Sequence, residues 1–421
     1  MITPAFNLTA TERVLPRLAL DFTTASLDSR ITFTRASNTA TRVNSLGYIE
    51  TINADLPRFD YDPVALTCKG VLIEESRSNI ALQSNGFSIT ATWPVSRVGM
   101  AATGSSGTSP DGTNNAYKLN EDTGSLTKII SQAITATNVV NTFSVYVKAA
   151  GRTNIELAII GSANYGAAYD LTAVTVGTNV AGFTQATGAT IVDAGNGWRR
   201  CTITQNAAAG TSLTCRIYLS TGAAVNYTGN GTSGVLLYGA QLEAGAFATS
   251  YIPTVASQVT RSADVATMTG TNFSDWYNAT EGAFLAQADG LTKSKFCGLI
   301  CASDTTITNR IDLAFIGGTL GGLGRFTVSN SVNQVDSGNN ATPTVILNTA
   351  YSVAATYKVD SFAWSFAANT VGTDTVGTIP TVTQLEIGAR AADNFLNGHV
   401  KKISYWPQRL TNAEIQAFSK G

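Results

Sequence analysis

Short runs in which apolar and polar residues alternate recur along the chain. Within residues 143–148, Phe143, Val145 and Val147 alternate with Ser144, Tyr146 and Lys148, and the same period returns over residues 213–220. Successive side chains of a β-strand point to opposite faces, so each run predicts a half-buried strand. Two more runs, 351–359 and 362–366, are separated only by a polar pair and predict a hairpin.

Turn-forming residues fill the stretches between these runs. Clusters of Gly, Ser, Thr and Asn occupy residues 104–113, 226–234 and 336–341, and their spacing leaves little room for helices. One helix is predicted near the end of the chain, where Thr411 and Glu414 form a capping box ahead of an apolar run. The pattern therefore favours an all-β chain of antiparallel sandwiches.

The length of 421 residues suggests two or three domains. We predict an N-terminal joining module over residues 1–80, a densely stranded jelly roll over 81–264, and a second sandwich over 265–421. No repeat of fixed period is present, which disfavours a solenoid or a propeller.

Composition and charge narrow the classes of function. Charged residues make up 13%, glycine occurs 38 times, and the formal net charge is −1. Without a basic patch, nucleic-acid binding is not expected. No apolar stretch reaches 18 residues, and the first 20 residues mix polar residues with Pro4 and Pro16, so we expect neither a signal peptide nor membrane insertion. The five cysteines show no metal-like pairing and are expected to be buried thiols formed in a reducing cytoplasm.

Several motifs resemble those of structural proteins in tailed bacteriophages. In the first 80 residues, these motifs are Leu20–Phe22, Phe33–Ser37, Arg58–Pro63 and Gly70–Asn79. The second segment resembles carbohydrate-binding jelly rolls of phage fibres and spikes through Phe143–Lys148, Gly197–Cys201, Gly239–Gly245 and Ala248–Thr254. The third resembles concanavalin-A/laminin-G-type sandwiches through Glu281–Phe284, Leu385–Gly388 and Gly398–Trp406.

This resemblance implies a virion protein that is made and assembled in the bacterial cytoplasm. By analogy, the subunit is expected to be a homotrimer that contacts other virion proteins through its N-terminal module. The resemblance implies a tail fibre or spike subunit that binds host surface polysaccharide during adsorption. A purely structural head or baseplate decoration is the alternative, and a glycan depolymerase is the third possibility.

Catalysis is not expected. The single histidine, His399, precedes a strand and is interpreted as a surface residue at its edge, so no His-based triad is predicted. Glycoside hydrolysis needs two carboxylates, for which Asp60, Asp62, Glu74 and Glu75 are the nearest candidates. Asp60 and Asp62 are interpreted as turn residues around Pro63, and Glu74 and Glu75 would face opposite sides of a strand.

No cofactor is predicted, and no Cys or His spacing indicates a transition-metal site. Jelly rolls of the type that the sequence resembles often hold structural calcium, for which Asp193, Glu243 and Asp304 are the candidate ligands.

A glycan site would pair an aromatic platform with polar hydrogen-bonding groups. The aromatic residues in or beside turn-rich stretches are the candidates, whereas Trp198 and Trp364 fit core positions; the candidates are Trp93, Tyr165, Tyr227, Trp276 and Tyr277. The alternative is that each covers the rim of a core or a subunit interface.

Overall fold

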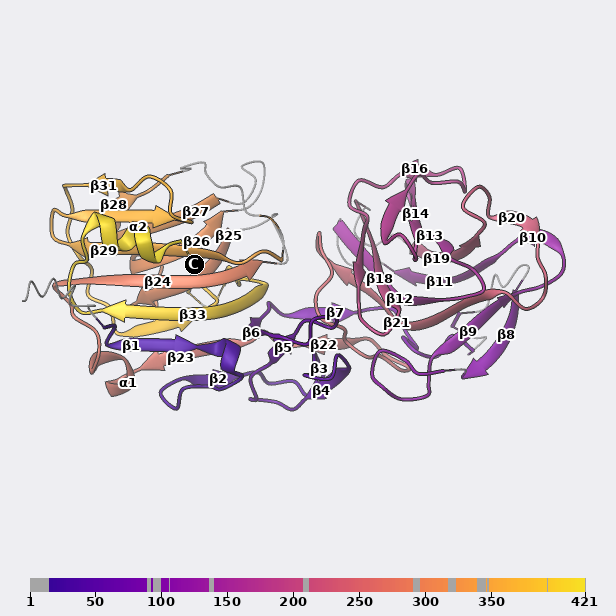
Figure 1. Ribbon diagram of the computed structural model, residues 1–421, viewed down its shortest axis with the longest axis horizontal. Helices are drawn as coiled ribbons and strands as arrows, with labels where there is room; N and C mark the ends of the chain where they lie inside the picture. The colour runs from indigo at the N-terminus through magenta and orange to yellow at the C-terminus, as the bar shows by residue number, and fades with distance from the viewer. Residues whose placement is uncertain are drawn as a thin grey trace, which may run out of the picture.

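The computed structural model describes residues 15–420 except 89–91, 94–99, 106, 136–139, 207–211, 291–295, 317–322, 339–345, 347 and 392. Two β-sandwiches lie side by side (Figure 1). One contains strands from both ends of the chain and is called the terminal lobe (residues 15–79 and 259–420). The other is called the central lobe (residues 80–258).

The terminal lobe consists of two antiparallel sheets. The first has the order β31 (Gly372–Asp374), β30 (Phe362–Phe366), β29 (Tyr351–Lys358), β24 (Glu281–Gly290), β33 (Gly398–Trp406), β6 (Cys68–Ile73) and β5 (Phe59–Tyr61), and β1 (Leu18–Asp21) also pairs with β33. The second has the order β2 (Thr32–Thr34), β23 (Val265–Thr269), β32 (Gln384–Ile387), β25 (Phe296–Ser303), β26 (Asn309–Ile316), β27 (Leu323–Asn330) and β28 (Val332–Asp336). A large apolar core fills the space between them.

The central lobe also has two sheets around one core. The first has the order β11 (Ile129–Thr135), β19 (Ser212–Ser220), β13 (Asn154–Ile160), β14 (Asn164–Asp170) and β15 (Thr175–Gly177), with β16 (Thr184–Gln185) parallel to β14. The second has the order β17 (Thr190–Asp193), β18 (Trp198–Asn206), β12 (Val140–Ala150), β21 (Gly234–Ala244), β9 (Tyr117–Glu121) and β8 (Met100–Ser105).

Three two-stranded ribbons complete the sheets: β3 (Ala40–Val43) with β4 (Ile49–Ile52), β7 (Arg77–Asn79) with β22 (Val259–Arg261), and β10 (Ser125–Thr127) with β20 (Asn226–Thr228). Helical segments are short: η1 (Phe22–Thr24), α1 (Thr271–Ser274) and α2 (Asn412–Phe418). The helix α2 begins with the predicted capping box of Thr411 and Glu414, and it packs against β29 and β30. No helix in the described ranges is both long and apolar enough to cross a membrane.

The central lobe is inserted into the terminal lobe. The chain leaves the terminal lobe at β7 and returns at β22, and these two strands pair antiparallel. The expected module over residues 1–80 therefore does not stand alone, because β1, β5 and β6 belong to the eight-stranded sheet and β2 pairs with β23. Those strands cover apolar core residues that the C-terminal segment would otherwise expose.

The expected all-β fold of antiparallel sandwiches is confirmed. The predicted hairpin is present as β29 and β30, with Val353 opposite Phe366. Trp198 and Trp364 are buried as predicted, with 1% and 7% of their surface exposed.

Candidate functional site

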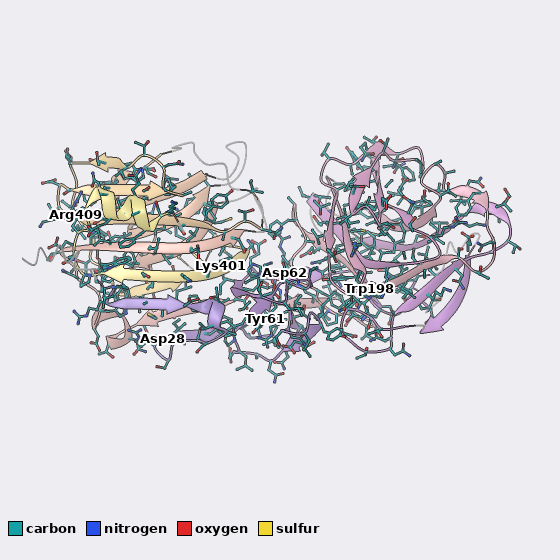
Figure 2. All side chains as sticks on the ribbon, in the orientation of Figure 1. Asp28, Tyr61, Asp62, Trp198, Lys401 and Arg409 are labelled. Atoms are coloured by element: carbon teal, nitrogen blue, oxygen red, sulfur yellow. The ribbon has the colours of Figure 1, made fainter. Side chains whose placement is uncertain are left out.

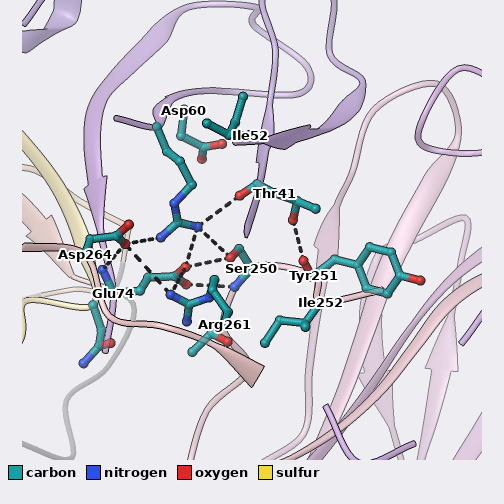
Figure 3. Close-up of polar contacts among 12 residues, drawn as sticks. Thr41, Ile52, Asp60, Glu74, Ser250, Tyr251, Ile252, Arg261 and Asp264 are labelled. Atoms are coloured by element: carbon teal, nitrogen blue, oxygen red, sulfur yellow. Dashed lines mark hydrogen bonds and ion pairs between the residues drawn. The ribbon is translucent and has the colours of Figure 1, made fainter. Parts of the chain in front are cut away.

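A cluster of buried charges holds the two lobes together where the chain passes between them. Arg58 Nη1 donates to Glu74 Oε2 at 2.8 Å and to Ser250 Oγ at 2.7 Å, and Arg58 Nη2 donates to Asp264 Oδ2. Ser250 belongs to the central lobe, whereas the other three residues lie in the terminal lobe. Figure 3 shows Glu74, Ser250 and Asp264 gathered around these contacts.

Two more arginines complete this charge cluster. Arg35 donates to Asp264 Oδ1 at 3.0 Å, and Arg261 lies 3.4 Å from Glu74 Oε2. Burial works against the charge on Glu74, but Arg261 and Arg58 outweigh it and lower the pKa of Glu74. The side chains of all five charged residues, which belong to the terminal lobe, have no exposed surface, and Ser250 links them to the central lobe.

A groove of about 260 Å³ opens at the surface of the same junction. Two turns of the terminal lobe and one of the central lobe form it, and it is lined by Leu46, Pro63, Val64, Leu66, Asp193, Gly195, Asn196, Gly197 and Arg199. A Cβ added to Gly195 would lie 2.4 Å from the carbonyl oxygen of Pro63, so glycine allows the turns to meet. Figure 2 places Asp62, which precedes one of these turns, between the lobes.

Polar groups form the central-lobe side of the groove. Asp193 Oδ1 accepts from Arg199 Nη1 at 2.7 Å and from the amide of Gly195 at 3.0 Å. The Asp193 side chain is 41% exposed and that of Arg199 is 15% exposed, so both are accessible to a ligand. Asn196 is exposed beside them in a left-handed backbone conformation, with φ of 52°.

Apolar side chains form the opposite side. Leu46, Val64 and Leu66 are 67%, 60% and 47% exposed, which is unusual for a group of large aliphatic residues. The turn that carries Val64 and Leu66 is fixed by Asp62, whose carboxylate accepts from the amides of Val64 and Ala65 at 2.8 Å. The groove therefore offers an apolar wall facing a carboxylate, an amide and a guanidinium.

A larger groove of about 480 Å³ lies beside the edge strand β11. Its Gln132 accepts from the Leu82 amide and donates to the Leu82 carbonyl, both at 2.8 Å, so this amide is already occupied. None of its described lining residues is charged. The junction groove therefore has the more suitable chemistry for a polar ligand.

Two of the five predicted platform aromatics are buried. Trp93 is 0% and Trp276 is 2% exposed, so the prediction that they form an exposed platform is wrong. The indole N–H of Trp93 donates to the carbonyls of Leu82 and Gln83, and that of Trp276 to the carbonyl of Asn272. Each indole therefore has a backbone partner as well as an apolar surrounding, which is how a loop tryptophan becomes part of a core.

The three predicted tyrosines are half-buried at separate places. Tyr277 stacks on Phe273 at 4.7 Å and packs against the terminal core, and Tyr165 packs against the central core. Tyr227 donates its hydroxyl to Glu121 at 2.8 Å and lies beneath the guanidinium of Arg152. None of the five predicted aromatics lines the junction groove, so the structure brings together no platform from this set.

The prediction that His399 is a surface residue is wrong. It lies within β33, is 1% exposed, and is held between two carboxylates. Its Nδ1 lies 2.6 Å from Asp289 Oδ1 and its Nε2 lies 2.9 Å from Asp60 Oδ2. Asp60 also accepts from the amide of Val43, so it is not the local turn residue that was predicted, whereas Asp62 is.

This bridge makes stability depend on pH. Burial disfavours the imidazolium, but Asp289 and Asp60 outweigh it, so the pKa of His399 lies above its ordinary value. Burial also opposes the Asp289 charge, but His399 lowers the pKa of Asp289 to about 2. The histidine contribution is therefore complete below about pH 6.5 and is lost as the pH rises through the raised pKa. The Asp289 contribution is complete above about pH 4 and is lost as the pH falls through about 2.

We expect His399→Gln to destabilise the protein by about 1.5–3 kcal/mol at pH 5.5, and by less at pH 8.5, because the wild type then loses its imidazolium. Urea unfolding of both proteins at the two pH values measures the difference. The chain has one histidine, so no other imidazole contributes in this range. An equal loss at both pH values would contradict the assignment.

The candidate calcium ligands do not come together. Glu243 is fully buried and accepts from Gln241 and from Thr249, Asp193 pairs with Arg199, and Asp304 accepts from Thr306 and Asn309. In the described part of the chain, no group of three or more His, Cys, Asp or Glu side chains is arranged to hold a metal ion.

The groove residues other than Asp193 were missed by the sequence interpretation. Leu46, Val64 and Leu66 are isolated aliphatic residues within turns, and nothing local distinguishes them from core residues. The run Gly195, Asn196, Gly197 is the local signal that could have indicated an unusual turn, because all three have positive φ. Their meeting depends on contacts between segments more than 120 residues apart.

No protein-family model and no curated protein matches the sequence. Among solved structures, a sialidase CBM40 from Ruminococcus gnavus bound to alpha2,3 sialyllactose has a TM-score of 0.28 and 10% identity over 34% of this chain and 84% of its own. A heptameric SAP-like pentraxin from Limulus polyphemus has a TM-score of 0.27 and 13% identity over 34% and 70%. Trypanosoma rangeli sialidase has a TM-score of 0.28 and 15% identity over 37% and 26%. With TM-scores of this size, these similarities identify neither the family nor the function of the chain.

Proposed function

We propose that the chain is a non-enzymatic glycan-binding subunit of a tailed-phage virion, in a fibre or spike, and that the junction groove binds a saccharide. The observation that carries the proposal is the pairing of an exposed apolar wall with Asp193, Asn196 and Arg199 in one groove. Sugar rings present apolar C–H faces and hydroxyl edges, which match these two walls. The volume of about 260 Å³ is suited to one or two sugar units.

The virion assignment has separate support in the resemblance of the sequence motifs to phage structural proteins. Two of these motifs, 58–63 and 70–79, carry Arg58 and Glu74 of the charge cluster and Asp62 of the groove turn. The proposed role of the motifs is therefore to join the two lobes and shape the groove. A homotrimer that contacts other virion proteins through residues 1–80 belongs to the same proposal. A cryo-EM map of an intact phage particle tests the virion assignment. A map that lacks this subunit would reject the assignment.

The absence of catalysis is also part of this proposal. The two ring nitrogens of His399 are occupied by carboxylates, and Glu74 is neutralised by arginines, so neither is placed to act as a general base. Release of reducing sugar from host polysaccharide by the purified protein would favour the depolymerase instead.

We expect Asp193→Ala and Asn196→Ala each to weaken saccharide binding about tenfold, because each removes a hydrogen-bonding group worth roughly 1.4 kcal/mol. A glycan array identifies the oligosaccharide, and calorimetric titration measures its Kd. Asp374→Ala is the matched control. Asp374 also accepts a hydrogen bond from a backbone amide two residues along the chain, but it lies in β31 of the terminal lobe, outside the groove. Unchanged affinity in both groove variants would reject the groove as the site.

A further inference from the structure

A row across five neighbouring strands on the outer face of the seven-stranded sheet is polar except at Cys301. Pairing aligns Glu386 of β32 with Cys301 of β25, then Asp312 of β26, Thr327 of β27 and Asp336 of β28. Residues that alternate with them along the strands, such as Leu313 and Phe326, belong to the apolar core. The row therefore points away from the core, although four of its five residues are buried.

Among the residues that the structure describes, two hydrogen-bonding atoms in the middle of this row have no partner. Asp312 and Thr327 are 0% exposed, and Asp312 Oδ2 and Thr327 Oγ1 are both buried without a hydrogen bond. The other oxygen of Asp312 accepts from Arg310 Nε at 2.5 Å. Buried polar atoms are seldom left unsatisfied, yet Asp312 keeps an unused acceptor beneath the face and adds negative potential there.

A tight turn after β32 brings an arginine to the same face. Glu386 accepts from the amide of Ala391 at 2.5 Å, and the Arg390 amide donates to the Asp393 carbonyl at 2.9 Å. A Cβ added to Gly298 would lie 2.7 Å from the Ala389 carbonyl carbon, so glycine lets this turn cross the sheet. The Arg390 guanidinium then lies 3.7 Å from the centre of the Phe296 ring.

Arg390 differs from the other two arginines on this face. Arg310 pairs with Asp312, and Arg325 donates to Asp336 at 2.8 Å. Arg390 is half-buried, forms no ion pair with a described residue, and has a buried Nε without a partner. Burial disfavours its charge, whereas the Phe296 ring and the more distant Asp312 stabilise it.

We propose that this face holds a second binding site, for a sugar that bears a carboxylate, in which Arg390 binds the carboxylate and Arg325 lies beside it. A planar guanidinium with free donors matches a carboxylate through two parallel hydrogen bonds. Asp312 acts as a positioning residue, because it holds Arg310 and attracts Arg390 from beneath. The inference rests on the proposed glycan binding for its ligand class, but it uses a different site from the junction groove.

The test compares a glucuronate-containing disaccharide with its carboxyl-reduced counterpart by calorimetric titration of the full chain. We expect the wild type to bind the acidic sugar at least tenfold more tightly, and Arg390→Ala to abolish this preference. Arg390→Lys keeps the positive charge but lacks the planar guanidinium, so we expect it to retain part of the preference for the acidic sugar. Scanning calorimetry checks that both variants fold. If Arg390→Ala does not fold, the sugar preference of Arg390→Lys tests the proposal instead.

Asp312→Ala separates positioning from simple electrostatics. Removing a negative charge from the face would by itself strengthen the attraction for an anion, whereas loss of positioning weakens binding. We expect at least a threefold loss, confined to the acidic sugar. Tighter binding by this variant would overturn the positioning role of Asp312.

Two control variants keep this inference distinct from the groove proposal. Arg30→Ala removes an arginine paired with Asp28 elsewhere on the terminal lobe, and Asp193→Ala alters only the groove. Both are expected to keep the preference for the acidic sugar. The second site would be overturned if the wild type bound the two sugars equally. It would also be overturned if Arg390→Ala and Arg390→Lys preferred the acidic sugar as strongly as the wild type does. Neither outcome depends on the groove variants.

Discussion

Asp264→Ala is expected to reduce the free energy of unfolding by about 3–5 kcal/mol, the loss typical of breaking a buried ion pair. Asp264 accepts from Arg35 and Arg58 and from the amide of Glu74, and its side chain has no exposed surface. The variant removes the ion-pair partner of Arg35 and leaves Arg58 and Arg261 to share Glu74. Urea unfolding, followed by far-UV circular dichroism, measures the loss.

Asp28→Ala is the matched control for this prediction. Asp28 also pairs with an arginine, Arg30 at 2.7 Å, but both side chains are partly exposed. A pair screened by solvent contributes little, so we expect a loss below about 1 kcal/mol. Equal losses in the two variants would show that the charge cluster contributes no more than a surface pair.

Trp276→Ala is expected to destabilise the protein by about 3–5 kcal/mol, through lost apolar burial and the cavity left behind. The indole packs edge-on against Phe273 and Tyr405, with ring centres 4.9 Å apart in both pairs. Thermal unfolding measures the effect as a lower Tm. Because the side chain is 2% exposed, binding of saccharide to the folded fraction should not change.

Val376→Ala is the control for loss of apolar volume at the surface. Val376 is 71% exposed in the same lobe, so its truncation is expected to change the free energy of unfolding by less than about 0.5 kcal/mol. If Trp276→Ala instead keeps its Tm but loses saccharide binding, the tryptophan belongs to a binding surface, as the sequence first suggested.

The insertion of the central lobe gives the charge cluster its importance. Strands β7 and β22 carry the chain out of and back into the terminal lobe, and Arg261 lies at the end of β22. The same junction carries the groove, whose two walls come from different lobes. A fixed arrangement of the lobes is therefore a condition for a preformed groove.

The sequence by itself determined the elements whose formation depends on near neighbours. The alternation over residues 351–366 predicted the hairpin of β29 and β30, and Thr411 with Glu414 predicted the start of α2. The turn at Asp62 was also predictable, because its carboxylate bonds to amides two and three residues along the chain. In each case the interacting groups lie within one turn or one hairpin, so the local pattern contains the physical cause.

Only the tertiary structure decided which residues are buried and which meet. Trp93 and Trp276 lie in turn-rich sequence, yet other strands cover them, and His399 gains Asp60 from 339 residues away. The groove and the charge cluster likewise join segments from both sides of the inserted lobe. Exposure and ion pairing at these positions depend on contacts between distant segments, and the pattern of a single strand or turn does not record such contacts.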